Sequence, residues 1–435
     1  MVLVFLILSV LVMFVDGLVF DNYNSRPSMA MMHMDMKPVI VPDPAAPGQE
    51  EYLEGYGLIP SEPADPGVPL EPEIVVEDGQ EIKVYRIVAN NVAHEIRPGV
   101  TVSMISFNNR VPAPTIRVTE GDRVRVILVN NATDPHTIHW HGVENVTSES
   151  DGVPDVGQEW IRPGESFTYE FIAGPPGTRM YHCHVEAPHH ITMGMYGALI
   201  IDPRGDDGSP DPDRGSPFGP ADLDSAFLFS EFDSDHPHVP LPGEMMPMGP
   251  DSELPWLLSS PKFAMPFMPD LNEFLVNGKS FPAVPVYDVK EGQVVRWRLI
   301  NLGLQVHSIH IHGHHFTVTH RDGFRLPEPF EADTILIGPG ERYDVWFRTD
   351  NPGVWMIHDH ASLSAMADGY DPAGLMWVLR YEGADTEVLD AFLRKAATYE
   401  RNIRHMDEEH GRLTPSVPVG AGMEMDGGMD MEGGH

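Results

Sequence analysis

The sequence has little of what crosslinks a protein or makes it basic. Its 435 residues include a single cysteine, which excludes intrachain disulfides and hence a disulfide-stabilised scaffold. Lys and Arg number 28 against 65 Asp and Glu, for a formal net charge of −37. This balance excludes nucleic acid as a partner, because phosphate binding requires a basic surface. By contrast, 22 His and 24 Met are many, and both residue types are metal ligands.

Long apolar runs are also lacking, apart from residues 1–15. This run is short for a membrane span, so residues 1–20 are interpreted as a signal peptide or a membrane anchor. We therefore expect export to the periplasm or the extracellular space. Residues 21–75 are rich in Pro, Gly, Glu and Met without periodicity, which predicts a disordered leader.

The rest of the chain favours an all-β fold, because 42 Pro and 40 Gly are typical of short strands joined by turns. Apolar and polar residues alternate in 115–130 and 166–173, as in half-buried strands. The predicted organisation is a first β-domain (76–204), a linker (205–221), a second β-domain (222–383) with a loop insertion (237–270), and a short helix with a disordered Met-rich tail (384–435).

The two β-domains are predicted to be copies of one unit. EGDRVRVILVN-x5-HTIHWHG in the first matches EGQVVRWRLIN-x5-HSIHIHG in the second. Each domain then continues to a Met-x-His-x-His segment, RMYHCH at 179–184 and WMIHDH at 355–360.

Histidines separated by one residue recur more often than composition predicts. About one such pair is expected, and the sequence holds six. The pair 236/238 lies in a Pro-rich loop and is interpreted as a chance occurrence, and 312/314 shares His312 with a better pair. The other four occupy matching places in the two domains. Residues i and i+2 of a strand share a face, so each pair directs two imidazoles to one side. The four pairs are His139/His141, His182/His184, His310/His312 and His358/His360.

Cys183 indicates which metal these histidines serve. It lies between His182 and His184, so its sulfur points to the opposite face of the strand. His136 shares that face, and His190 and Met195 follow. One Cys, two His and a weak axial Met form the ligand set of a blue-copper site. His189 remains an alternative to His190, and Met193 an alternative to Met195.

These motifs resemble those of a known family. HTIHWHG, YHCH-x5-H-x4-M and HIHGHHF are similar to the signatures of laccase-like multicopper oxidases, and the two repeats resemble cupredoxin domains, which are Greek-key β-sandwiches. The resemblance covers about residues 76–383. It is strongest to the two-domain class, which has its type 1 copper in the first domain. Asp359 stands where Cys183 stands, so no type 1 copper is expected in the second domain.

The resemblance implies about four coppers per chain and a role for each motif. His136, Cys183, His190 and Met195 would bind type 1 copper, and His139 and His310 would bind type 2. The type 3 pair would be held by His141, His182, His184, His312, His358 and His360. Asp151 matches the acid that supplies protons.

The implied reaction oxidises a small reductant, a phenol or a metal ion such as cuprous ion, and reduces O2 to water. The resemblance also implies a homotrimer with copper clusters between chains. Two other functions remain open, namely a copper nitrite reductase and a non-catalytic copper store.

Overall fold

The computed structural model describes residues 58–234, 271–361, 364–365, 367 and 372–403, and all of them belong to one compact unit. The predicted signal peptide or anchor, the loop insertion 237–270 and the Met-rich tail after residue 403 lie outside these ranges. No helix in the described part of the chain is long and apolar enough to cross a membrane.

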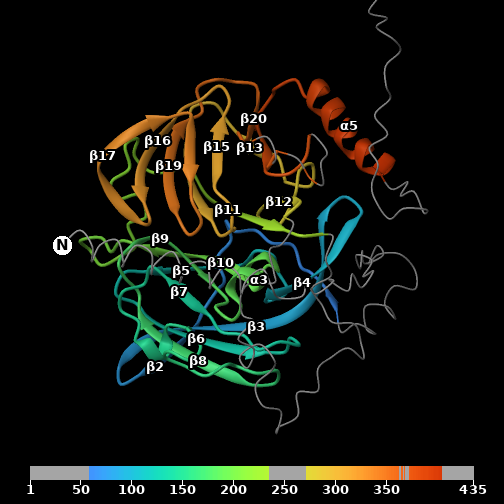
Figure 1. Ribbon diagram of the computed structural model, residues 1–435. Coiled ribbons are helices and arrows are strands. Elements are labelled where there is room, and N and C mark those ends of the chain that lie inside the picture. The colour runs from blue at the N-terminus through green and yellow to red at the C-terminus, as the bar shows by residue number, and fades with distance from the viewer. Residues whose placement is uncertain (1–57, 235–270, 362–363, 366, 368–371, 404–435) are drawn as a thin grey trace, which may run out of the picture. The chain divides into compact units, whose positions relative to one another are not determined.

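The first domain consists of two β-sheets (Figure 1). The larger sheet contains β1 (Ile59–Pro60), β2 (Glu73–Glu77), β3 (Gln80–Arg97), β4 (Val100–Phe107), β6 (Arg123–Asn130) and β8 (Ser166–Ile172). The smaller sheet has the order β5 (Ala113–Thr119), β10 (Tyr196–Asp202), β9 (Gly177–His182) and β7 (His139–His141). Along β6, every second residue is buried, as the alternating sequence predicts. Two short helices, η1 (Ser148–Ser150) and α3 (Ala187–Thr192), lie in the connections.

The predicted disordered leader, residues 21–75, extends too far along the chain. The backbone of β1 pairs in parallel with Val92 and Ala93 of β3, and Leu58 just before it is buried. β2 forms a hairpin with β3 through Asp78-Gly79, both at positive φ, a turn that such a dipeptide favours. Residues 58–75 therefore belong to the first domain. Their Pro- and Gly-rich composition concealed two strands that are specified by pairing with β3.

The second domain also consists of two sheets. The first has the order β12 (Glu273–Val276), β11 (Leu223–Phe232), β14 (Val294–Asn301), β19 (Arg342–Arg348), β16 (Phe316–Arg321) and β17 (Phe324–Ala332). The second has the order β13 (Tyr287–Val289), β21 (Met376–Tyr381), β20 (Val354–Asp359), β15 (His307–Ile311) and β18 (Thr334–Ile337). The β11–β14 and β13–β21 pairs are parallel, as are β3–β6 and β10–β5 in the first domain. The structure confirms the predicted all-β class.

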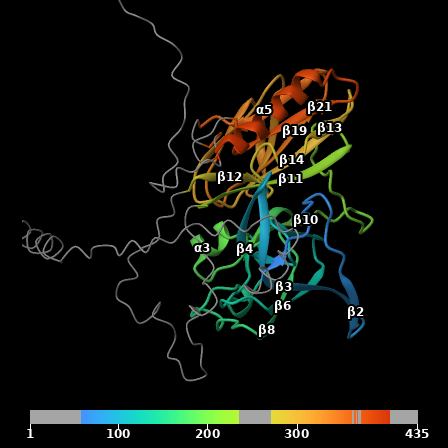
Figure 2. The same ribbon diagram turned by 90° about the vertical axis from the view of Figure 1, so that its right-hand side faces the viewer.

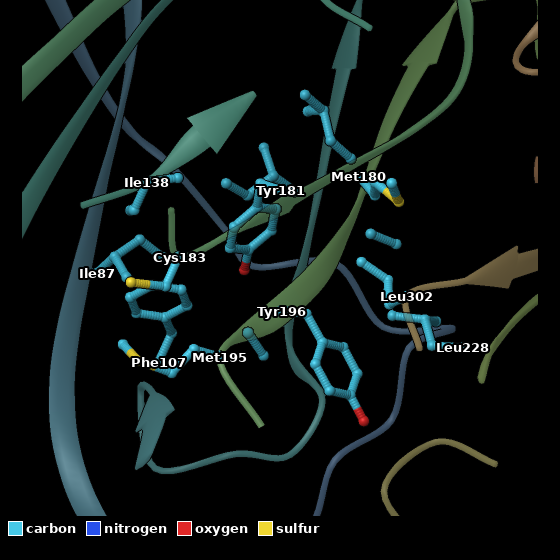
Figure 3. Close-up of a cluster of buried hydrophobic side chains, with 14 of the residues drawn as sticks. Ile87, Phe107, Ile138, Met180, Tyr181, Cys183, Met195, Tyr196, Leu228 and Leu302 are labelled. Carbon is cyan, nitrogen blue, oxygen red and sulfur yellow. The ribbon is translucent and has the colours of Figure 1, made fainter. Parts of the chain in front are cut away.

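The two domains share a buried interface. The core of the first domain continues into Leu228 and Leu302 of the second (Figure 3). The Tyr196 hydroxyl lies 2.6 Å from Ser230 Oγ, and Arg97 forms a buried ion pair of 2.8 Å with Glu273. Burying such groups is tolerated because each has a partner.

β14 is buried along its whole length although it carries two arginines. Arg298 pairs with Asp224 at 2.7 Å, and its Nη1 donates to Thr178 of the first domain at 2.9 Å. Arg296 pairs with Asp344, which also accepts a hydrogen bond from Thr178. The polar positions of this strand therefore belong to the interface between the domains.

A helix near the end of the described chain, α5 (Glu387–Ile403), lies across the sheet that contains β13 and β21 (Figure 2). Leu389 and Ala396 pack against Phe281, Met376 and Val378. The structure thus places a helix within residues 384–435, where the sequence predicts a short one.

Candidate metal centres

The single thiol lies between two imidazoles in the core of the first domain. Cys183 Sγ is 3.6 Å from Nδ1 of His136 and 3.4 Å from Nδ1 of His190, and all three residues are buried. Among the described residues, these three form a potential metal-binding group, because their ligand atoms all lie within 4.8 Å of one another. The structure thus brings His190, rather than His189, to the cysteine.

Backbone contacts hold this arrangement. Cys183 N donates to Met195 O at 3.0 Å, and Met195 N donates to His190 O at 3.0 Å. The loop between β9 and β10 is closed by the six-residue helix α3, which accommodates the seven-residue interval from Cys183 to His190. Met195 is fully buried and lies in the same apolar cluster as Cys183 (Figure 3). Met193 is buried as well, so the choice of Met195 as the axial ligand stays a prediction.

Burial controls the protonation of this group. It lowers the pKa of His136 to about 3 and lowers the pKa of His190 well below its ordinary value. Both imidazoles are therefore neutral at pH 7 and carry a lone pair for a cation. Burial also raises the pKa of the Cys183 thiol to about 12, so a metal ion must displace its proton. A soft sulfur with two imidazoles in a dry site fits copper.

Four histidines form the first quartet, from β7, from β9 and from the second residue after β9: His139, His141, His182 and His184. The His139 ring centroid lies 5.7, 5.2 and 5.3 Å from those of the other three, in that order. His139 Nδ1 bonds Asp151 O at 2.8 Å, and His182 Nδ1 bonds Cys183 O at 2.9 Å. A carbonyl accepts, so both Nδ1 atoms carry the proton and both Nε2 atoms are free to bind a metal.

His141 of this quartet contacts the second domain. Arg342 Nη1 donates to His141 Nδ1 at 3.1 Å. Burial and the Arg342 charge lower the pKa of His141 to about 3. This imidazole is therefore neutral at pH 7.

The second quartet has the same construction in β15, β20 and the following residues: His310, His312, His358 and His360. His310 Nδ1 bonds Asp333 O at 2.9 Å, and His358 Nδ1 bonds Asp359 O at 2.8 Å. His312 and His358 approach with their Nε2 atoms 3.2 Å apart. Unlike the first quartet, this one has two exposed members, His312 and His360.

The two quartets are separate within one chain. Among the described residues, no ring contact joins a histidine of one quartet to a histidine of the other, whereas ring contacts connect the members of each. Each quartet is therefore brought together within its own domain.

Asp151 lies beside the first quartet. Its Oδ1 is 3.2 Å from His139 Nδ1, and its side chain is 34% exposed. A carboxyl group in contact with both a ligand histidine and solvent is suited to relay protons. The role of Asp151 as the acid that supplies protons stays a prediction.

The second domain has a carboxylate in place of the thiol. His307 lies between Asp359, 2.7 Å from its Nδ1, and Glu231, 2.8 Å from its Nε2, and all three side chains are fully buried. Burial alone would lower the pKa of His307, but hydrogen bonds to Asp359 and Glu231 and their charges raise it to about 9. Sequence reasoning missed Glu231. Its signal was an acidic residue within the apolar strand AFLFSEF.

Comparison with known proteins identifies relatives of both domains. Two family models, each described as multicopper oxidase, match residues 88–206 and 256–380. The crystal structure of a blue copper oxidase from Nitrosomonas europaea is 38% identical, with a TM-score of 0.59, over 69% of this chain and 86% of that one. A copper nitrite reductase from the same organism is 25% identical, with a TM-score of 0.53, over 70% of this chain and 96% of that one.

Among curated proteins, the multicopper oxidase MmcO of Mycobacterium tuberculosis (strain ATCC 25618 / H37Rv) is 31% identical over 262 residues. That match covers 57% of this chain and 48% of MmcO, so the chain spans about half the length of the curated relatives it matches. The structural likeness confirms the cupredoxin fold. Because the matched regions lie on both domains and take in the cysteine site and the two quartets, this chain belongs to the multicopper oxidase family, whose cofactors are type 1, type 2 and type 3 copper.

Proposed function

We propose that the protein is a laccase-like oxidase that removes single electrons from a small reductant and reduces O2 to water. One observation carries the proposal: Cys183 faces two buried imidazoles, while its neighbours His182 and His184 belong to a histidine quartet. Copper at the cysteine site would supply one-electron transfer, and copper at the quartets would supply O2 reduction. The tripeptide 182–184 then connects the two sites covalently.

The ligand roles follow the family resemblance. His136, Cys183, His190 and Met195 would hold the type 1 ion. His139 and His310, whose Nδ1 atoms are each bound by an aspartate carbonyl, would hold type 2. The remaining six histidines of the quartets would hold type 3. Asp151 would deliver protons beside His139, since its carboxyl group is close to that ring and to water.

The separation of the quartets supports assembly of the chain into a homotrimer. Head-to-tail contact that closes into a ring would place the first quartet of one chain against the second quartet of the next. An exposed apolar side chain beside the second quartet supports a contact between chains. Leu336 is 64% exposed and pairs with Ser308, on the sheet face that carries His310. The corresponding face of the first domain carries Met180 and Tyr196, which are buried in one cluster with Leu228 and Leu302 of the second domain (Figure 3).

The experiment is a comparison of the copper-loaded wild type with Cys183→Ser. The wild type should be blue, contain about four coppers per chain and consume O2 with at least one donor among phenols, cuprous, ferrous and manganous ions. The variant should lose the blue colour and about one copper. A Cys183→Ser protein that stays blue would contradict the assignment.

A copper nitrite reductase is the second candidate, because a protein of that name covers both domains. Two coppers per chain together with nitrite turnover would favour it. Four histidine pairs exceed what a single catalytic copper needs, which favours the oxidase. Copper binding without turnover of O2 or nitrite would instead favour a copper store.

We also propose export, from the apolar residues 1–15. Cell fractionation combined with the mass of the purified protein tests it. Recovery of the uncleaved chain in the cytoplasm would contradict it.

A further inference from the structure

The second domain preserves the framework of the cysteine site without its cysteine. Cys183 N donates to Met195 O at 3.0 Å, and Asp359 N donates to Leu375 O at 3.0 Å. In the same way, His182 Nδ1 bonds Cys183 O at 2.9 Å, and His358 Nδ1 bonds Asp359 O at 2.8 Å. Asp359 therefore occupies the position of Cys183, between two quartet histidines.

Around Asp359, protein atoms alone complete the network. Its Oδ2 bonds His307 Nδ1, and its Oδ1 accepts from Ser308 N at 2.9 Å and Ala361 N at 3.0 Å. Glu231 bonds the other nitrogen of His307 and accepts from two backbone amides, Leu304 N at 2.7 Å and Gln305 N at 3.2 Å. Three strands are thus joined: β11 through Glu231, β15 through His307 and β20 through Asp359.

The first domain has no such network. The Cys183 thiol contacts two imidazoles and a carbonyl at long distances of 3.4 to 3.7 Å and has a backbone hydrogen bond with Thr137. These interactions are weak, because sulfur is a weak donor and a weak acceptor. His136 Nε2, which corresponds to the His307 nitrogen that binds Glu231, has no hydrogen-bond partner among the described residues. A bound ion would supply here the connection that hydrogen bonds supply in the second domain.

We infer that Glu231, His307 and Asp359 are positioning residues that hold the second quartet in place without copper, whereas the first quartet is held firmly only when the cysteine site is loaded. This inference rests on the proposed function, since it treats both quartets as copper ligands. None of the three residues is proposed to bind copper or substrate.

Hydrogen exchange on the full-length, copper-free protein tests the inference through two matched amides. The Cys183 amide (bonded to Met195 O) and the Asp359 amide (bonded to Leu375 O) occupy equivalent places. We expect the Asp359 amide to exchange about tenfold more slowly or better, because its surroundings are fully bonded. Added copper should slow exchange at Cys183 strongly and at Asp359 little.

Two variants connect this difference to the network. Asp359→Ala removes the central carboxylate of the network. Glu231→Gln is a milder change that can be used if the Asp359→Ala variant does not fold. Either should accelerate exchange in 357–361 and weaken copper binding to the quartets, while the blue colour of the first domain is retained. Asp288→Asn is the control, because Asp288 lies in the same sheet but its 61% exposed side chain pairs with Arg380, outside the network.

The outcomes separate this inference from the proposed function. Equal exchange of the two amides in the copper-free wild type would overturn the inference even in an active oxidase. A colourless protein without O2 uptake would overturn the proposed function. In that case the predicted difference between the amides of the copper-free chain could still be measured.

Discussion

Asp151 contacts one imidazole in two ways, and the two can be separated. Its backbone carbonyl bonds His139 Nδ1 at 2.8 Å, and its carboxylate lies 3.2 Å from the same atom. Because the carbonyl already orients the ring, the side chain is available for proton transfer. We predict that Asp151→Asn lowers the rate of O2 uptake by about 10²-fold, as is typical for loss of a general acid. Copper content and blue colour should be unchanged.

Asp333→Asn is the matched control. The Asp333 carbonyl bonds His310 at 2.9 Å, whereas its carboxylate accepts from Thr334, whose hydroxyl lies 3.0 Å from His310 Nδ1, so the carboxylate is connected to the ring through that hydroxyl. The Asp333→Asn variant should consume O2 at a rate within about twofold of the wild type, since the Asp333 side chain is not proposed to transfer protons. Equal losses in the two variants would argue against a specific role for Asp151.

His307 makes stability depend on pH in a defined direction. Its pKa is raised to about 9 in the folded chain from an ordinary value of 6.5. The folded state thus retains a proton that the unfolded chain releases. This stabilisation is complete below about pH 6.5 and is lost as the pH rises through 9, with a size of roughly 3 kcal/mol.

We predict that the free energy of unfolding of the copper-free protein falls between pH 6.5 and pH 9, as measured by urea denaturation at several pH values. Glu231→Gln removes one of the two charges that hold the proton, so it should flatten this fall. An unchanged slope would show that another group is responsible.

At the scale of elements, α5 is held by a few apolar side chains. Leu389 is 5% exposed and packs against the sheet of β20 and β21, whereas its neighbour Val388 is 78% exposed. We predict that Leu389→Ala lowers the free energy of unfolding by about 2–3 kcal/mol, because it opens a cavity under the helix.

Val388→Ala should change that free energy by less than about 0.5 kcal/mol. Chemical denaturation of the copper-free protein measures both variants. A similar loss for the two would mean that α5 does not depend on this apolar contact.

At the scale of the whole molecule, the second quartet lies on an open sheet face, and the apolar Leu336 on that face is 64% exposed. We predict that Leu336→Glu prevents assembly, because it places a charge where the proposed ring buries an apolar side chain. Light scattering should give a monomer. Copper should fall from about four per chain to about one, since the cysteine site lies within one domain.

Val76→Glu is the control, because Val76 is equally exposed, at 64%, but lies on β2. It should leave mass and copper content unchanged. A Leu336→Glu monomer that still binds about four coppers would show that both quartets close within one chain.

Local pattern alone determined the all-β class, the two domains and the four histidine pairs. The reason is that side chains in a strand alternate with a period of two, so the spacing of His139 and His141, or of Cys183 and His182, assigns each a face before any contact is known. The family motifs, which combine these spacings, identified the family correctly.

Only the tertiary structure decided which distant groups meet. The choice of His190 over His189 depends on how the short helix α3 closes the loop onto Cys183. The buried pairing of Glu231 with His307 spans 76 residues, and β1 exists through its pairing with β3. Such contacts depend on strand order and on the packing of the two domains, neither of which is encoded in local periodicity.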